Sequence, residues 1–185
     1  MTKIALTLSG SSRDGSINSR LARLMGTKLR DRGAEVTDLS LSDFPMPLFN
    51  EDVESNEGDP RGAIELAHLL AAADAVFIST PEYNNSIPPL MKNTIDWVSR
   101  QKTGPFKRAT FGLGAVSDGR LSGAVALSHL RDIFGKMGVL MAPTSLSVAF
   151  GKEGFTEDGA LLDPVQASRA DQLADQLMTI TRNPQ

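Results

Sequence analysis

The hydrophobic and polar positions of the chain follow two alternating periods. Five segments carry the short apolar runs typical of strands: residues 3–9, 34–39, 75–79, 109–116 and 138–149. The third and fourth runs are apolar enough to be buried on both faces of a parallel sheet, whereas the charges of the second suit a sheet edge. Pro143 interrupts the fifth run, so we expect a break in that strand.

Between these runs, apolar residues recur every three or four positions, which predicts helices. We expect helices at residues 17–30, 60–73, 89–100, 124–136 and 164–181. The helix at 89–100 carries two adjoining apolar rows, which is more than a sheet face normally covers. We therefore expect part of it to contact a second subunit. On the same helix, Asp96 and Arg100 are four residues apart and are expected to pair.

Residues 41–60 show neither period. Pro45 and Pro47 block a helix, so this segment is predicted to be a long ordered or semi-ordered loop. Phe44, Leu48 and Phe49 form an apolar cluster on it. Two interpretations are open: the cluster contributes to an interface, or it covers the chain's own core.

Five strands that alternate with five helices predict a single α/β domain over residues 1–185. The expected fold is a doubly wound, five-stranded parallel sheet of order 2-1-3-4-5, with helices on both faces. In this order a ligand binds outside the carboxyl ends of the first, third and fourth strands. Polar loops rich in Gly, Ser and Asn follow all three of these strand ends.

Composition narrows the classes of function. The chain has no cysteine, which excludes disulfides, iron–sulfur clusters and thiol chemistry, and its two histidines, His68 and His129, lie far apart, which disfavours a metal site. A net charge of −3 disfavours nucleic-acid binding. No apolar run has the length of a membrane span and no signal peptide is recognisable, so we expect a cytoplasmic protein without a membrane partner.

The loop at residues 10–18 joins the first strand to the first helix and carries hydroxyls, Arg13 and an amide. Backbone N–H groups at a helix N-terminus bind anions, phosphate above all. Gly10 and Gly15 have the spacing of a P-loop, but Ser16 and Ile17 stand where its Lys and hydroxyl belong, and the dinucleotide fingerprint also fails. A site for a single terminal phosphate and a simple turn capped by Ser16 are both open.

The second polar loop, residues 80–88, lies between a buried strand and a helix. Pro81 and Pro88 hold its backbone extended, so we expect its N–H and C=O groups to bond outside a sheet, for example with the edge of a flat heterocycle beside Tyr83. The alternative is a turn in which Asn84 and Asn85 satisfy their own backbone.

Several motifs together resemble the NADPH-dependent FMN reductase family. They are Gly10-Ser11-Ser12-Arg13-x-x-Ser16-x-Asn18, Pro81-Glu82-Tyr83-Asn84-x-Ser86-x-Pro88, Lys92-Asn93-x-x-Asp96-Trp97-x-Ser99-Arg100, Ser117-x-Gly119 and His129-Leu130-Arg131. The segment at residues 119–123 departs from the family pattern, because relatives often carry a Gly-Gly pair there. The resemblance implies a flavodoxin-like fold that binds FMN without a covalent bond.

The resemblance also implies a set of site residues. Ser11, Arg13, Ser16 and Asn18 would bind the phosphate, residues 81–86 would line the isoalloxazine, and Ser117 and Gly119 would complete the site. The residues expected to bind the cofactor are Ser11, Arg13, Ser16, Ile17, Asn18, Pro81, Glu82, Tyr83, Asn84, Asn85, Ser86, Ser117 and Gly119. No side chain is expected to be catalytic, because the chemistry takes place on the cofactor.

The expected activity is that of an NAD(P)H oxidoreductase with NADPH or NADH as donor. In the expected ping-pong mechanism a hydride passes to N5 of FMN, the nicotinamide leaves, and a small-molecule acceptor takes its place. Quinones, chromate, azo dyes and ferric chelates are the family's acceptors, and a homodimer or tetramer is its usual assembly. Two alternatives are a flavodoxin-like electron carrier that does not itself oxidise NAD(P)H, and a phosphate- or nucleotide-binding module without redox function.

Overall fold

The sheet has the predicted order. The computed structural model describes residues 2–119 and 121–182. Five parallel strands form one sheet in the order β2-β1-β3-β4-β5, with the bounds β1 Ile4–Ser9, β2 Glu35–Ser40, β3 Ala75–Thr80, β4 Thr110–Val116 and β5 Met141–Val148. The predicted edge position of the second strand is confirmed.

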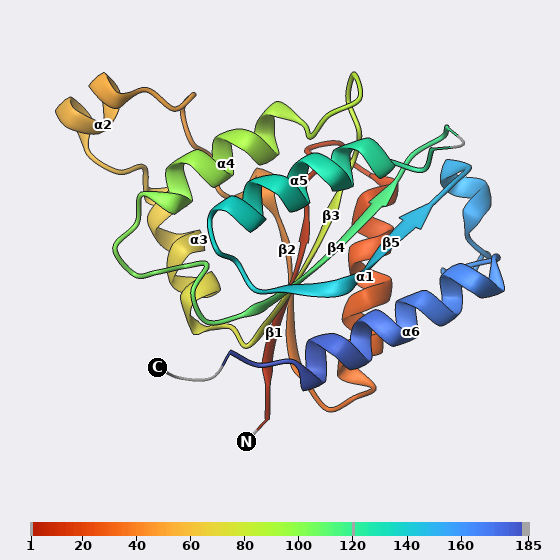
Figure 1. The fold of residues 1–185 in the computed structure, drawn as a ribbon. Coiled ribbons are helices and arrows are strands. Elements are labelled where there is room, and N and C mark those ends of the chain that lie inside the picture. Colours follow the sequence, from red (N-terminus) through yellow and green to blue (C-terminus); the bar gives the residue numbers. More distant parts are fainter. Residues whose placement is uncertain (1, 120, 183–185) are drawn as a thin grey trace.

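Helices cover both faces of the sheet (Figure 1). Their bounds are α1 Ile17–Arg30, α2 Glu51–Glu57, α3 Arg61–Ala72, α4 Pro89–Ser99, α5 Ala124–Lys136 and α6 Pro164–Thr179. α3, α4 and α5 lie on one face, and α1 and α6 on the other (Figure 1). In the parts of the chain that the structure describes, no helix has both the length and the apolar character needed to span a bilayer.

The hydrophobic core lies on both sides of the two central strands. Every residue of β3 and β4 is buried, as the continuous apolar runs predict. Successive side chains of these strands point to opposite faces, so Val76 and Phe111 pack with α3 to α5, while Phe77 packs with α1 and α6. Because the strands are parallel, this packing keeps their carboxyl ends together at one edge of the sheet.

The prediction that residues 41–60 form a long ordered or semi-ordered loop without a helix is wrong in two places. Leu41–Asp43 forms a 3-10 turn and Glu51–Glu57 forms α2, which has no buried residue. The Asn50 side chain accepts a hydrogen bond from Asp52 N (2.8 Å), and three acidic residues occupy the first turn of α2, where they favour the helix dipole. Pro45 and Pro47 are therefore followed by a helix that begins directly after the cap at Asn50.

One side of α4 holds residues 47–54 against the domain. Asn93 Nδ2 and Trp97 Nε1 both donate to Pro47 O, at 2.9 and 2.8 Å. Arg100 forms a two-pronged ion pair with Glu54 at 2.6 and 2.7 Å. The predicted Asp96–Arg100 pair is therefore wrong, and Asp96 pairs with Lys92 instead.

These contacts also account for the apolar rows of α4. Met91, Ile95 and Val98 lie in the core, and Trp97 is fully buried with Phe49 packed edge-on against it at 5.0 Å. Phe44 and Phe49 thus cover the chain's own core, whereas Leu48 is 80% exposed, and for it the interface interpretation stays open. The apolar character of α4 gives no argument for a second subunit, and the homodimer stays a prediction.

The fifth strand is continuous, contrary to the predicted break. Pro143 lies inside β5, at the edge of the sheet, but the positions paired with β4 pass from Met141 directly to Ser145, so the ladder is interrupted at the proline. The register between β4 and β5 shifts between Phe111 and Leu113, which forms a local bulge. Because proline has no N–H to donate to the ladder, such a bulge is where it is tolerated.

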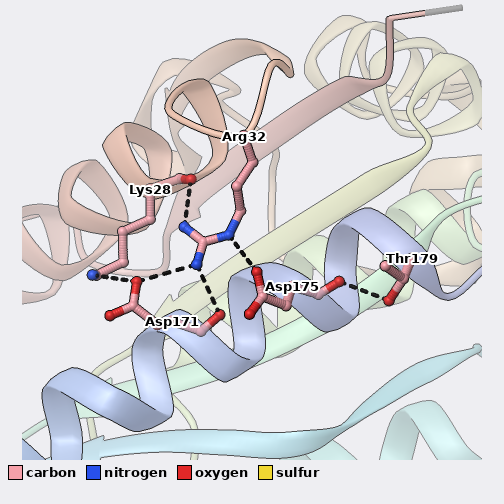
Figure 2. A network of polar contacts seen from close by, with 5 residues as sticks. All are labelled: Lys28, Arg32, Asp171, Asp175 and Thr179. Carbon is pink, nitrogen blue, oxygen red and sulfur yellow. Dashed lines mark hydrogen bonds and ion pairs between the residues drawn. The ribbon is translucent and has the colours of Figure 1, made fainter.

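Charged residues join α1 to α6 on the outer face of the domain (Figure 2). Lys28 Nζ and Arg32 NH2 both reach Asp171 Oδ1, at 2.8 and 3.2 Å, and Arg32 Nε donates to Asp175 Oδ1 at 2.6 Å. α1, which begins at the predicted phosphate loop, and α6 both pack on the same face of the sheet, and these pairs join them outside the core.

Candidate functional site

A polar cavity of about 400 Å³ lies at the carboxyl ends of β1, β3 and β4. The predicted site residues that line it are Ser11, Arg13, Ser16, Ile17, Asn18, Pro81, Glu82, Tyr83 and Ser117. Larger hollows of about 650 and 710 Å³ lie on the outer surface, beside α1 and beside α2. Neither is at the strand ends, so the smaller cavity is the candidate site.

The first loop presents donors to this cavity. The Ser11 and Ser16 hydroxyl oxygens accept from Arg13 N and Asn18 N, both at 3.3 Å. Within the described residues neither hydroxyl donates a hydrogen bond and the Arg13 guanidinium has no ion-pair partner. The first turn of α1 contains no acidic residue, so no carboxylate of that turn offsets the positive end of the helix dipole. The loop is built to receive an anion.

Asn18 lies beneath this loop and is almost completely buried. Its Oδ1 accepts from Ser79 Oγ (2.8 Å) and Val116 N (3.0 Å), and its Nδ2 donates to Val116 O (3.1 Å). One amide therefore joins the start of α1 to the carboxyl ends of β3 and β4. Three of its hydrogen-bonding positions are used inside the protein, which favours a positioning role over direct contact with a ligand.

The second loop is a tight hairpin in which Tyr83 and Ser86 bond to each other outside the five-stranded sheet, so the partners of these backbone groups are local and not a heterocycle. Tyr83 N donates to Ser86 O at 2.9 Å and Ser86 N donates to Tyr83 O at 3.0 Å. Asn84 and Asn85 between them have φ values of 50° and 58°, as a type I′ turn requires. Asparagine tolerates this conformation well, which agrees with the alternative of a local turn.

The hairpin is attached to α5 at both ends. Glu82 Oε2 accepts from Ala126 N (2.9 Å), an N–H of the first turn of α5, whose own N-cap, Gly123, has no side chain to do so. Ser86 Oγ lies 3.0 Å from His129 Nδ1. Glu82 and Ser86 therefore position Tyr83 at the cavity, where its ring is 43% exposed.

The structure leaves four predicted residues outside the lining of the cavity: Asn84, Asn85, Ser86 and Gly119. The first three build and anchor the hairpin. Gly119 O accepts from Ser122 N within the third loop (3.1 Å), so it shapes that loop. Arg120, in the segment that departs from the family pattern, lies outside the described residues.

A fourth segment completes the cavity and was missed from sequence. Phe150, Lys152 and Glu153 line it, together with Gly15, Val116 and Asp118. Hydrogen bonds from Ser117 N to Val148 O (3.2 Å) and from Gly151 N to Ser117 O (3.1 Å) attach this segment to the third loop. The sequence analysis assigned no site residue to this segment. The parallel order of β4 and β5 could have indicated that both strand ends reach the same edge.

Comparison with known proteins supplies the family. The model of the NADPH-dependent FMN reductase family matches residues 2–153. A quinone reductase of Escherichia coli is 40% identical over 129 residues, 69% of this chain and 67% of its own length. An NAD(P)H-dependent FMN reductase of Pseudomonas aeruginosa is 35% identical over 161 residues, 85% of this chain and 84% of its own length.

A likeness of fold accompanies these matches. The flavoenzyme NAD(P)H:acceptor oxidoreductase FerB of Paracoccus denitrificans superposes with a TM-score of 0.81 and 24% identity, over 98% of this chain and 100% of that one. The family match covers all three polar loops and the lining residues Phe150, Lys152 and Glu153 of the fourth segment. The chain belongs to the NADPH-dependent FMN reductase family, a family of oxidoreductases.

Proposed function

We propose that this protein binds FMN in the cavity at the strand ends. With it the protein oxidises NADPH or NADH and reduces quinones or similar small acceptors. The observation that carries the proposal is the anion site of the first loop. One cavity is lined by three such features. They are Arg13, which has no ion-pair partner among the described residues, two hydroxyls that donate no hydrogen bond there, and the N-terminus of α1, whose first turn contains no acidic residue. A phosphate monoester matches this set of donors.

The residues present fit FMN beyond its phosphate. A volume of about 400 Å³ is within the range of cofactor sites. Tyr83 offers an aromatic surface, and Asn18 and Val116, at the end of β4, also line the cavity. When bound, FMN supplies the ability to accept a hydride and to pass electrons to a second substrate.

The roles of this chain's residues follow from their contacts. Arg13, Ser11 and Ser16 bind the phosphate, and Ser117 lies at the opposite loop of the cavity. Asn18, Glu82 and Ser86 act as positioning residues through the hydrogen bonds given above. None of these roles requires a proton transfer by a side chain. Binding of donor and acceptor in turn at the same open face gives the ping-pong order that we propose.

The phosphate assignment is tested with an Arg13→Ala, Ser16→Ala double variant. Loss of one charged and one neutral hydrogen-bonding group is expected to raise the Kd of FMN about 100-fold, as measured by flavin fluorescence titration. Because Ser16 also caps α1, its alanine costs about 1 kcal/mol of stability, and Arg13→Ala, Ser16→Asn keeps a cap acceptor as a check. Arg23→Ala removes an exposed arginine outside this cavity and is the matched control. Unchanged FMN affinity in both double variants would contradict the assignment.

The redox function is tested by mixing the FMN-loaded protein with NADPH, and separately with NADH, in the absence of oxygen. Prompt loss of the 450 nm flavin band with either donor supports the proposed enzyme. A band that persists until a separate reductase is added would instead support the electron carrier, and a chain that takes up no FMN would support the module without redox function. Light scattering of the same samples tests the predicted homodimer.

A further inference from the structure

Phe150 has a backbone conformation that large side chains rarely adopt. It follows β5 with φ at 61°, in the left-handed region, and the next residue, Gly151, has φ at 52°. The other non-glycine residues with positive φ in the described chain are Asn84, Asn85 and Ser122, which are all small and polar. A bulky residue in this region is a genuine outlier, and such outliers gather at functional sites.

The surrounding backbone imposes this conformation. Gly151 N donates to Ser117 O (3.1 Å) and Glu153 N donates to Phe150 O (3.0 Å), so the turn is hydrogen-bonded on both sides of Phe150. A Cβ on Gly151 would meet the carboxylate of Asp118, and its positive φ strains any other residue, so glycine suits this position best. The turn explains the positive φ at position 150, but it does not explain a phenylalanine.

Burial does not explain the phenylalanine either. The Phe150 side chain is 58% exposed, so it recovers little hydrophobic free energy, and no ring contact or hydrogen bond in the described structure involves its side chain. Asparagine or glycine would suit the backbone better at a solvent-facing turn. A side chain that the fold does not use is therefore kept at a strained position.

The position of Phe150 suggests its use. It lines the candidate cavity together with Tyr83, and the two aromatic residues come from different elements. The proposed phosphate contacts come from the first loop, so Phe150 is not needed for them. It lies on the fourth segment, which the proposed cofactor site otherwise leaves without a role.

We propose that Phe150 forms one side of the binding subsite for the second substrate and selects planar aromatic acceptors, such as quinones, by stacking on their ring. This inference rests on the proposed function and names the substrate class of that same site. Ring stacking contributes enough to change a binding-limited rate about 2- to 12-fold. An acceptor that has no ring gains nothing from Phe150.

The experiment measures the oxidative half-reaction by itself. The FMN-loaded protein is reduced with dithionite without oxygen, so that no nicotinamide is present, and is mixed in a stopped-flow instrument with a water-soluble naphthoquinone or with ferricyanide. In Phe150→Ala we expect the second-order rate constant for the quinone to fall about 2- to 12-fold, with the ferricyanide rate constant within about 2-fold of wild type. Phe150→Tyr, which keeps a ring, should restore the quinone rate.

Two further variants separate this role from a structural one. Leu162→Ala removes a side chain that is also 58% exposed but lies outside the cavity, and it should leave both rates unchanged. Phe150→Gly removes the ring and relieves the strained conformation, so it should lose quinone rate as Phe150→Ala does without a fall in Tm. A Tm lowered by more than about 5 °C would show that the ring supports the fold and would overturn the inference.

Other results would also overturn it. Equal losses with quinone and ferricyanide, an unchanged quinone rate in Phe150→Ala, or dissociation of an oligomer on loss of the ring would each remove the proposed subsite. If the wild-type chain takes up no FMN, the proposed function and this inference both fall. If the wild-type protein is reduced and reoxidised normally, but the Phe150 variants show no selective loss of the quinone rate relative to the ferricyanide rate, this inference is wrong and the proposed function stands.

Discussion

At the scale of single residues, the candidate site divides into side chains that offer hydrogen bonds to a ligand and side chains whose bonds are used within the protein. Ser11, Arg13 and Ser16 belong to the first group, and Asn18 and Glu82 to the second. Both groups carry the polar residue types expected of a binding site, so residue type does not distinguish them. Their bonding partners do.

The positioning role of Asn18 gives a prediction. Asn18→Ala leaves Val116 N, Val116 O and the Ser79 hydroxyl without their partner in a buried site, and we expect a loss of at least about 2 kcal/mol in the free energy of unfolding, measured with urea. The affinity for FMN should also fall, because the ends of β3 and β4 lose their link to α1.

Asn93→Ala is the control for this variant. Asn93 also bonds to backbone groups, Pro47 O and Phe49 N, but it lies on the outer side of α4 and away from the cavity. Its loss should cost less stability and leave the affinity for FMN unchanged. An Asn18→Ala variant as stable as wild type would contradict the positioning role.

At the scale of elements, short polar contacts join the helices to one another and to the loops, outside the hydrophobic core that packs them on the sheet. α5 receives the Glu82 carboxylate at its first turn, α4 holds residues 47–54, and α1 is tied to α6 by Lys28, Arg32, Asp171 and Asp175 (Figure 2). The first contact joins a helix to the candidate site directly. The last lies at the far end of α1, which begins at the proposed phosphate loop.

The α1–α6 contact predicts a pH dependence of stability. The hydrogen bond from Lys28, helped by Arg32, holds the pKa of Asp171 below its ordinary value of 3.8. The unfolded chain therefore binds this proton more readily, and the contribution to stability is present above about pH 4 and is lost as the pH falls through the lowered pKa. Asp171→Asn should cost no more than about 1 kcal/mol at pH 7, because the Asp171 side chain is 49% exposed.

Urea unfolding at pH 7 and at pH 3 checks this prediction. The difference in free energy of unfolding between wild type and Asp171→Asn should shrink at pH 3. This pH lies below the ordinary carboxyl pKa of 3.8, so the unfolded wild-type chain is then mostly protonated at Asp171. Asp132→Asn removes a carboxylate of a more exposed pair, with Lys136 at 3.3 Å, and should change little at either pH. A difference for Asp171→Asn that stays constant with pH would show that its charge is not the cause.

At the scale of the whole molecule, the proposed ligand meets three strand ends and the loops that follow them, so binding is coupled to global stability. FMN at 100 times its Kd should add about 2.7 kcal/mol to the free energy of unfolding, which is about 5–10 °C in Tm for a domain of this size. Differential scanning fluorimetry measures this shift.

Riboflavin is the matched control, because it has the same ring and lacks the phosphate. At the same concentration it should shift Tm less than FMN does, since it cannot use Arg13 and the two hydroxyls of the first loop. Equal shifts with riboflavin and FMN would show that the cavity binds the ring without help from the proposed phosphate site.

The sequence by itself determined the fold class, the strand order and the edge at which the site lies. Buried strands, helices and the turn residues between them leave signals within a few positions of one another, and the order 2-1-3-4-5 is the common solution for five such units. The polar loops after β1, β3 and β4 were identified for the same reason, and nine predicted residues line the cavity.

Only the tertiary structure decided which polar groups meet across the chain. Asn18 bonds to Val116, 98 positions away, and Arg100 bonds to Glu54 in place of its helical neighbour Asp96. The segment at Phe150 reaches the cavity because β5 lies beside β4, although residues 117 and 150 are far apart in sequence. Such partners depend on distances that a local pattern does not contain, since several partners of suitable chemistry are always present and packing selects among them.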